Sequence, residues 1–449
     1  MIHRNQNIMK DLTNGKPLKL IITFAIPLFI GQLFQLFYSL VDTRIVGEIL
    51  GETSLAAVGS TTSLSDMLVG LLNGLTNGFA IIISTFYGAK DFINMKKSIA
   101  ATLLLSIGFT IIISILCLLL NNQILSILNV SDAILSQAKS YICVILAGLI
   151  ASTIYNAYAA ILRAIGDSFT PLIFLVISTI TNIALDYIFI LWFDMNVAGA
   201  AFATVVSQGI SAVLCFFYVK KRYSQLSLEK KDYIPVKNIY NKLIKTGLSM
   251  GFMVSFVNIG TVALQTSINT FGTNIIVAHT AARKATTMFM LPFSVFGTTL
   301  ATYCGQNLGA KKYNRIKQGI KQTVLLTFVW CALVVIIAYT ITPDIIRIIT
   351  ASDIQEVIDT ASLYLRVNTS LYFVPAVICL FRNSMQGFGD SKTPVFSSSL
   401  ELIGKVLIAF FLAPRIGYWG IIVAEPIVWI IMVIPLIINM YRNPIFKKA

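Results

Sequence analysis

The 449-residue sequence has few charged residues, because Asp, Glu, Lys and Arg make up only 12% of it. A soluble globular domain carries about 25%. This deficit, together with 56% hydrophobic residues and a mean hydropathy of +0.81, excludes an ordinary cytosolic enzyme and any disordered or fibrous protein. The sequence has only two histidines and six cysteines. They are scattered without the spacing of metal ligands, so we expect no such metal site.

The scarcity of histidine also argues against catalysis. Only His3 and His279 are available for acid–base chemistry at neutral pH. Neither a His-Glu-x-x-His metalloprotease motif nor a phosphate-binding P-loop occurs. The sequence therefore predicts that the protein is not an enzyme and is not driven directly by ATP.

The apolar residues form long runs, each of about the 20 residues that a helix needs to cross a hydrocarbon core of about 30 Å. Since no run alternates with a period of two, we expect helices and an all-α polytopic membrane protein. We count twelve crossings: Leu20–Leu40, Ala57–Phe86, Ile99–Leu120, Ile134–Ile161, Pro171–Phe193, Gly199–Val219, Leu243–Thr270, Ile276–Cys304, Ile320–Ile341, Val357–Leu380, Val395–Leu412 and Gly420–Met440.

The distribution of basic residues predicts the orientation of these crossings. Of 34 Lys and Arg residues, 26 fall in segments that we place in the cytoplasm, including Arg382 and Lys392 after the tenth crossing, and five fall in the opposite loops. Basic loops stay on the cytoplasmic side. We therefore expect both termini in the cytoplasm and a multi-pass protein of the plasma (inner) membrane. The net charge of +15 follows this topology, so the lipid bilayer is the expected partner and nucleic acid is not.

The chain repeats itself after 221 to 223 residues. Three landmarks recur in the same order: YGAKDFINMKKSI at Tyr87 and LGAKKYNRIKQGI at Leu308, GDSFTP at Gly166 and GDSKTP at Gly389, and Gly199 and Gly420. Six crossings in each half give both halves the same orientation, as in secondary transporters with a parallel repeat and a pseudo-twofold axis along the membrane normal. We predict an N-lobe of six helices at 1–220, a basic cytoplasmic linker at 221–242 and a C-lobe of six helices at 243–449.

Both copies of Gly-Asp-Ser-x-Thr-Pro predict a helix–turn–helix hinge. Gly ends one helix, Asp or Ser caps the next, and Pro lies in its first turn. A structural role therefore explains this motif better than a binding role.

Polar residues gather on three predicted helices of the N-terminal half. Tyr38 and Asp42 are four apart on the first helix, Asn182 and Asp186 are four apart on the fifth, and Thr204 lies on the sixth. A carboxylate at membrane depth costs several kcal/mol unless it is protonated or paired. Such an oxygen-rich set suits a hard cation such as Na⁺, and two neighbouring carboxylates can equally share H⁺. The alternative is that Asp42 and Asp186 are unconnected residues near the outer surface.

The charged residues of the C-terminal half allow two interpretations. Glu401 and Lys405 are four apart on the eleventh helix, in the orientation that favours an ion pair, so they either neutralise each other or belong to a network. Arg283 and Lys284 lie on the eighth helix with no acid near them in sequence, and Glu425 lies near the start of the twelfth. A structural role and a gating or substrate role are both open for these residues.

Taken together, these motifs resemble the multidrug and toxic compound extrusion (MATE) family. LAAVG at Leu55, the YGAK and LGAK motifs, the repeated GDSxTP and the polar set of the N-terminal half carry the resemblance over essentially the whole chain. It implies a V-shaped antiporter that exports cationic, amphipathic drugs in exchange for Na⁺ or H⁺. We expect a monomer with no cofactor other than the coupling ion.

The resemblance also implies roles for single residues. In the branches with an N-lobe cation site, the pattern is an Asp in helix one, Asn-x-x-x-Asp in helix five and a Thr in helix six. The matching residues here are Asp42, Asn182, Asp186 and Thr204. A helix-one proline, whose bending is proposed to accompany coupling, and three polar cavity positions match Pro27, Gln35, Tyr38 and Asn156.

A second function remains open. Flippases of the same superfamily move a lipid-linked saccharide or peptidoglycan precursor and often use cationic cavity residues to meet the pyrophosphate. Arg283 and Lys284 are the candidates for that role here, so we place this function second.

Overall fold

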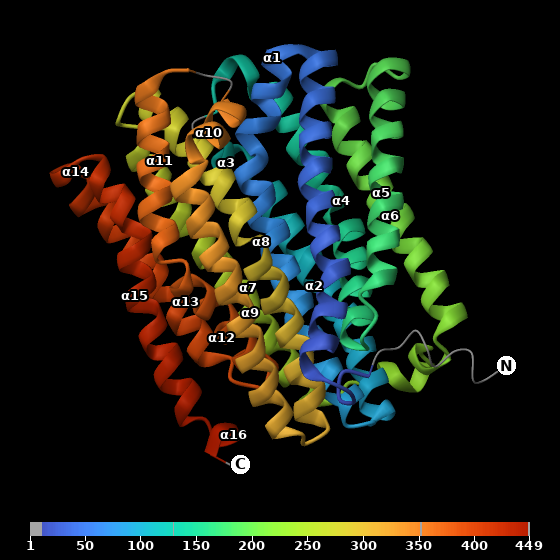
Figure 1. The fold of residues 1–449 in the computed structure, drawn as a ribbon. Coiled ribbons are helices and arrows are strands. Elements are labelled where there is room, and N and C mark those ends of the chain that lie inside the picture. The colour runs from blue at the N-terminus through green and yellow to red at the C-terminus, as the bar shows by residue number, and fades with distance from the viewer. Residues whose placement is uncertain (1–10, 129, 351–352, 448–449) are drawn as a thin grey trace. The chain divides into compact units, whose positions relative to one another are not determined.

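The computed structural model describes residues 11–128, 130–350 and 353–447, and this part of the chain contains helices and no strand (Figure 1). The N-terminal half holds α1 (Pro17–Gly88), α2 (Phe92–Leu119), α3 (Asn121–Ile127), α4 (Asp132–Ala164), α5 (Phe169–Tyr187) and α6 (Asn196–Arg222). The C-terminal half holds α7 (Lys237–Ile268), α8 (Thr273–Gly309), α9 (Tyr313–Thr340), α10 (Thr342–Thr350), α11 (Gln355–Ser370), α12 (Phe373–Gly387), α13 (Lys392–Leu407), α14 (Ala413–Ile416), α15 (Tyr418–Arg442) and α16 (Pro444–Lys447).

The first helix is too long for a single crossing. Its 72 residues would extend about 108 Å at 1.5 Å per residue. The backbone leaves helical geometry inside α1 at Gly51, with φ 82° and ψ 176°, a conformation that costs glycine little. α1 therefore supplies the first two predicted crossings, one on each side of Gly51.

The number of crossings agrees with the prediction of twelve. Ten described helices are long and apolar enough to span a membrane, and α11 and α12 form a further, bent span. Because α1 counts twice, the described residues supply all twelve crossings.

The tenth crossing differs from the single run predicted at Val357–Leu380, because α11 and α12 meet at an angle of 56°. Pro375 has no N–H to donate to the carbonyl of Leu371. The N–H of Val374 donates to that carbonyl instead, at 2.9 Å. This tighter turn replaces a regular helical turn and bends the span.

The backbone confirms the internal repeat. Three pairs of residues with positive φ recur at the predicted offset: Gly51 and Gly272, Lys90 and Lys311, and Gly166 and Gly389. A π-helical turn follows α5 at Ile188–Trp192 and α13 at Ile408–Leu412. The two halves thus share the positive-φ residues and the π-helical turns that interrupt their helices, as well as the helices themselves.

The hinge motifs form as predicted, and the structure identifies the capping residue. Asp167 accepts hydrogen bonds from the backbone N–H groups two and three residues ahead, at 3.1 and 3.0 Å. Asp390 does the same at 3.1 Å in both bonds. The aspartate therefore caps the next helix in both copies.

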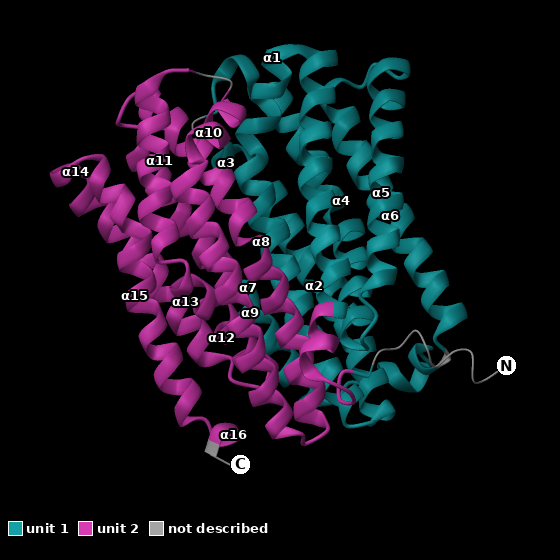
Figure 2. Cartoon of the chain, in the orientation of Figure 1, with its two compact units in different colours: residues 1–11, 23–251 teal, residues 12–22, 252–449 magenta. Residues whose placement is uncertain are grey.

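The described residues form two compact units (Figure 2): 23–251 with Asp11, and 12–22 with 252–447. Residues 12–22 belong to the second unit because the end of α8 and the start of α9 hold them. Gln306 Oε1 accepts from the N–H of Leu12 at 3.0 Å, and Arg315 Nη1 donates to the carbonyl of Gly15 at 2.7 Å. The predicted lobe boundaries at 220 and 243 stay a prediction.

Four glycines bring two helices of the first unit into backbone contact. Gly74 and Gly78 on α1 face Gly251 and Gly247 on α7, and a Cβ atom at position 78 would lie 2.6 Å from the Cα of Gly247. Small residues four apart allow this close approach between membrane helices. The contact anchors the start of α7 on the first unit.

The same stretch, GLSMG at 247–251, fits the letters of the nucleophile motif Gly-x-Ser-x-Gly. In hydrolases that motif occupies a sharp strand-to-helix turn, which exposes the serine. Here it lies within α7, and Ser249 is buried. We therefore assign the stretch to helix packing.

We predict that Gly78→Val destabilises the protein, because the new side chain would meet backbone atoms of α7 that cannot yield as a side chain would. Gly108→Val is the matched control, since a Cβ atom at Gly108 has no neighbour within 4 Å. Thermal unfolding of the purified protein in detergent should show a lower melting temperature for Gly78→Val than for Gly108→Val. Equal melting temperatures would contradict the close packing.

Candidate functional site

The structure brings together the polar residues predicted in the N-terminal half. Tyr38 and Asp42 lie on α1 before its break at Gly51, Asn182 and Asp186 lie on α5, and Thr204 lies on α6. All belong to the first unit. The spacing of four on α1 and on α5 places each pair on one helical face, and these faces meet.

Hydrogen bonds tie the three helices to one another. The hydroxyl groups of Tyr38 and Thr204 lie 3.2 Å apart, which joins α1 to α6. In the amide orientation that satisfies both of its polar groups, Asn182 donates to Asp186 Oδ2 at 3.1 Å and accepts from the N–H of Thr204 at 3.1 Å. Asn182 therefore positions the carboxyl group of Asp186 and links α5 to α6.

The carboxyl groups of Asp42 and Asp186 are neighbours that interact electrostatically. Asp186 has none of its surface exposed, and Asp42 is half-buried. The two aspartates are therefore neighbours, and their role as a coupling-ion site stays a prediction.

Two oxygens of this pair lack a partner. Asp42 Oδ1 and Asp186 Oδ1 are buried and accept no hydrogen bond from the described residues. Buried polar atoms normally have a partner. Unpaired carboxylate oxygens beside the hydroxyl group of Thr204 are the ligands that a hard cation prefers, and they can equally hold a proton. The residues present therefore fit Na⁺ or H⁺. We name Asp42, Asn182, Asp186 and Thr204, with Tyr38, the N-unit cluster.

A π-helical turn begins two residues after Asp186, at Ile188. Such turns widen a helix and are frequent at functional sites. The sequence offered no signal for this turn, because its residues, IFILW, are as apolar as those of the regular helix before it.

The remaining residues predicted in the first helices and the cavity lie apart from these contacts. Pro27 lies inside α1, and the backbone keeps helical φ/ψ angles there, so the bending proposed at this proline stays a prediction. Gln35 is exposed and Asn156 is half-buried. Among the described residues, the hydrogen bonds of the N-unit cluster come from Tyr38, Asn182 and Thr204, and not from Gln35 or Asn156.

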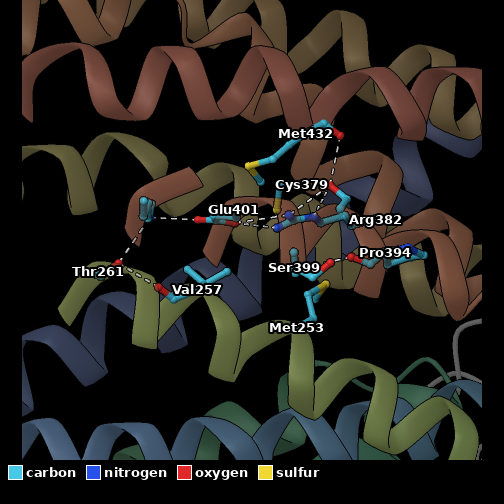
Figure 3. Close-up of polar contacts among 12 residues, drawn as sticks. Met253, Val257, Thr261, Cys379, Arg382, Pro394, Ser399, Glu401 and Met432 are labelled. Carbon is cyan, nitrogen blue, oxygen red and sulfur yellow. Dashed lines mark hydrogen bonds and ion pairs between the residues drawn. The ribbon is translucent and has the colours of Figure 1, made fainter. Parts of the chain in front are cut away.

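The charged residues of the C-terminal half form one buried chain, which we name the C-unit network. Its four ion pairs are Arg382 to Glu401 at 3.2 Å, Glu401 to Lys405 at 3.0 Å, Lys405 to Glu425 at 3.2 Å and Glu425 to Arg283 at 3.3 Å. Arg382, Glu401, Lys405 and Glu425 have side chains at most 8% exposed, whereas Arg283 is 33% exposed. Figure 3 shows Arg382 directed at Glu401.

This network corrects two expectations. Arg382, which we placed in a cytoplasmic loop, lies inside α12 and is buried, because α12 continues to Gly387 beyond the predicted end at Leu380. Arg283 does have an acidic partner, Glu425, from α15. Lys284 on the same helix is exposed. Spacing along one helix could reveal only the pair Glu401 and Lys405, since the other partners come from different helices.

Two residues of the C-unit network occupy the repeat-equivalent positions of two residues of the N-unit cluster. The offset of 223 that relates the hinge motifs carries Asn182 to Lys405, and the offset of 221 that relates Gly199 to Gly420 carries Thr204 to Glu425. Asn182 contacts Thr204, and Lys405 contacts Glu425. Where the first half has neutral oxygen and amide groups, the second half therefore has a fixed ammonium group and a carboxylate.

Comparisons with known proteins agree with this architecture. A sequence profile of the family described as MatE matches residues 27–188 and again 249–411. A probable multidrug resistance protein, YpnP of Bacillus subtilis, is 27% identical over 68% of this chain and 68% of its own length, and a second, YoeA, is 24% identical over 95% and 93%. The structure of a MOP superfamily transporter from Pyrococcus furiosus superposes with a TM-score of 0.89 at 23% identity, over 98% of each chain.

We predict that Glu401→Gln destabilises the protein by about 3–5 kcal/mol, because it leaves Arg382 and Lys405 buried without their shared carboxylate. The double variant Arg382→Gln/Glu401→Gln removes a cation and an anion together, so it should lose less stability than Glu401→Gln alone. Glu48→Gln breaks an exposed pair with Arg44 and should leave stability nearly unchanged, because water screens such pairs.

Denaturation of the purified variants measures these differences. Equal stability of Glu401→Gln and Glu48→Gln would show that the buried carboxylate is not needed to hold the network.

Proposed function

The chain belongs to the MatE family, whose profile covers both of its halves, and from this premise we propose that it is a cation-coupled antiporter that exports cationic, amphipathic drugs by alternating access. The observation that carries the proposal is the N-unit cluster, in which two carboxyl groups meet inside a membrane-spanning bundle. The curated relatives YpnP and YoeA are both described as probable multidrug resistance proteins, which supports drugs as the substrate class.

The contacts of the N-unit cluster suggest how ion and drug are coupled. A cation or proton between Asp42 and Asp186 neutralises two carboxyl groups that would otherwise repel each other in a medium of low dielectric constant. Tyr38 and Asn182 hold the helices that carry these carboxyls against Thr204 on α6. Loss of the ion leaves the carboxylates charged, so they favour a rearrangement of α1 against α5 and attract a cationic drug. Ion and drug would then occupy the unit in turn.

We also propose the orientation and assembly that the sequence predicts. Both termini would lie in the cytoplasm of a plasma membrane, in accord with the distribution of Lys and Arg. The transporter would act as a monomer with Na⁺ or H⁺ as the coupling ion and no cofactor.

The flippase function stays second. Its motivation was a pair of free cations, Arg283 and Lys284, available to a pyrophosphate. Arg283 pairs with Glu425 at 3.3 Å. Of the two candidates, this leaves Lys284 to bind a pyrophosphate, and Lys284 is exposed. Rescue of a flippase-deficient strain by this protein would reverse the order of the two functions.

We predict that Asp42→Asn abolishes cation-driven drug export, because an amide group can neither take up the proton nor supply the carboxylate charge that holds Na⁺. Cells that express this variant should lose the resistance to cationic drugs that the wild-type protein confers, with a drop in minimal inhibitory concentration to the level of the empty vector. Asn in place of Asp preserves shape, so expression should be unchanged.

Glu48→Gln is the matched control, since it removes an exposed carboxylate from the same helix, and should keep wild-type resistance. Immunoblots of membranes establish that the variants are present at equal levels. Wild-type resistance in cells with the Asp42→Asn variant would contradict the coupling role of the N-unit cluster.

A further inference from the structure

A cavity of about 280 Å³ is lined by residues of the second unit. This volume lies just below the range of about 300–1,000 Å³ that is typical of ligand pockets, so we expect a ligand no larger than a small aromatic molecule. Its apolar wall includes Met253, Met290, Trp429 and Met432, and its polar wall includes Arg382 and Glu401. Figure 3 shows Met253 and Met432 on either side of Arg382.

The charge of the C-unit network selects among ligands for this cavity. The network has three cationic side chains and two carboxylates. At the cavity, Arg382 shares the carboxylate of Glu401 with Lys405, which is only 2% exposed. Arg382 is the cationic group that lines the cavity, and a buried cation whose carboxylate is shared attracts an anion and repels a second cation. The cavity therefore favours a negatively charged ligand, in contrast to the N-unit cluster.

Arg382 is held in place to receive such a ligand. Its guanidinium group makes four hydrogen bonds, two to Glu401 Oε2 and two to Ser397 Oγ, at 3.2–3.3 Å. Ser397 in turn donates to the carbonyl of Met432 at 3.1 Å. Since an arginine has five N–H donors, one donor on Nη1 is left for an anion at the wall of the cavity.

The apolar wall suits an aromatic group. Methionine side chains are flexible and make favourable contacts between sulfur and aromatic rings. The indole of Trp429 adds a flat surface on which a ring can stack. Three methionines and one tryptophan thus provide an adaptable surface for the part of a ligand that carries no charge.

We propose that this cavity is a second ligand site, which binds aromatic amphipathic compounds that carry a single carboxylate. The carboxylate lies at Arg382, and the ring lies against Trp429 and the methionines. This site goes beyond the proposed function, because its ligands are anions and its residues belong to the other unit. Its occupancy does not depend on which ion drives export.

Binding of a matched pair of coumarins to the purified protein tests the proposal. 7-Methoxycoumarin-4-acetate carries the carboxylate, and the corresponding acetamide has the same ring without the charge. Both absorb where tryptophan emits, so binding near Trp429 quenches tryptophan fluorescence, and Trp429→Phe identifies the part of the signal that comes from this residue. We expect the wild-type protein to bind the acetate at least 10-fold more tightly than the acetamide.

Three variants locate the source of that preference. Arg382→Gln/Glu401→Gln, which keeps the excess charge of the network, should bind the acetate at least 10-fold more weakly and the acetamide as before. Lys405→Met leaves the cavity lining intact but removes the excess charge, and should weaken acetate binding several-fold. Arg366→Gln removes a half-buried arginine that does not line the cavity, and should have no effect.

Melting temperatures of the variants establish that each is folded. The proposal is overturned if the wild-type protein binds neither coumarin, if it binds the acetamide as tightly as the acetate, or if a folded Arg382→Gln/Glu401→Gln variant keeps the wild-type preference. None of these measurements involves transport, so they are independent of the tests of antiport.

Discussion

The contact between the carboxyl groups of Asp42 and Asp186 is the interaction on which the first unit depends. Two neighbouring carboxylates in an apolar bundle repel each other, and a bound proton or metal cation would relieve that repulsion. The surrounding structure makes that contact possible, because Asn182 orients Asp186 and Tyr38 joins α1 to Thr204. These contacts connect the carboxyl pair to α1, α5 and α6, so binding or loss of a cation at the pair would affect all three helices.

In the second unit, the buried carboxylates are paired with cationic side chains of the protein. Lys405 and Glu425, at the repeat positions of Asn182 and Thr204, contribute a fixed cation and a fixed anion. A tethered ammonium group keeps its carboxylate partners charged without an exchangeable ion. The two halves of the repeat thus differ, because one brings two carboxyl groups together and the other balances its carboxylates with tethered cations.

Local features of this fold could be predicted from the sequence, whereas contacts between distant helices could not. The twelve crossings, the repeat and the aspartate caps follow from run length, self-comparison and turn chemistry. The N-unit cluster could be anticipated because Tyr38 and Asp42, and Asn182 and Asp186, share helical faces. The partners of Arg283 and the burial of Arg382 depend on the packing of α8, α12, α13 and α15, which no spacing along the chain encodes. The bend at Pro375 was missed because the apolar run continues through it.

Dye movement in proteoliposomes tests the coupling role of Asp42 and Asp186 directly. The wild-type protein and the Asp186→Asn variant are compared under a Na⁺ gradient alone and then under a pH gradient alone. We expect that at least one gradient drives a cationic dye in the wild-type liposomes and that neither does so in the variant. Gradient-driven movement of undiminished rate in the Asp186→Asn liposomes would contradict it.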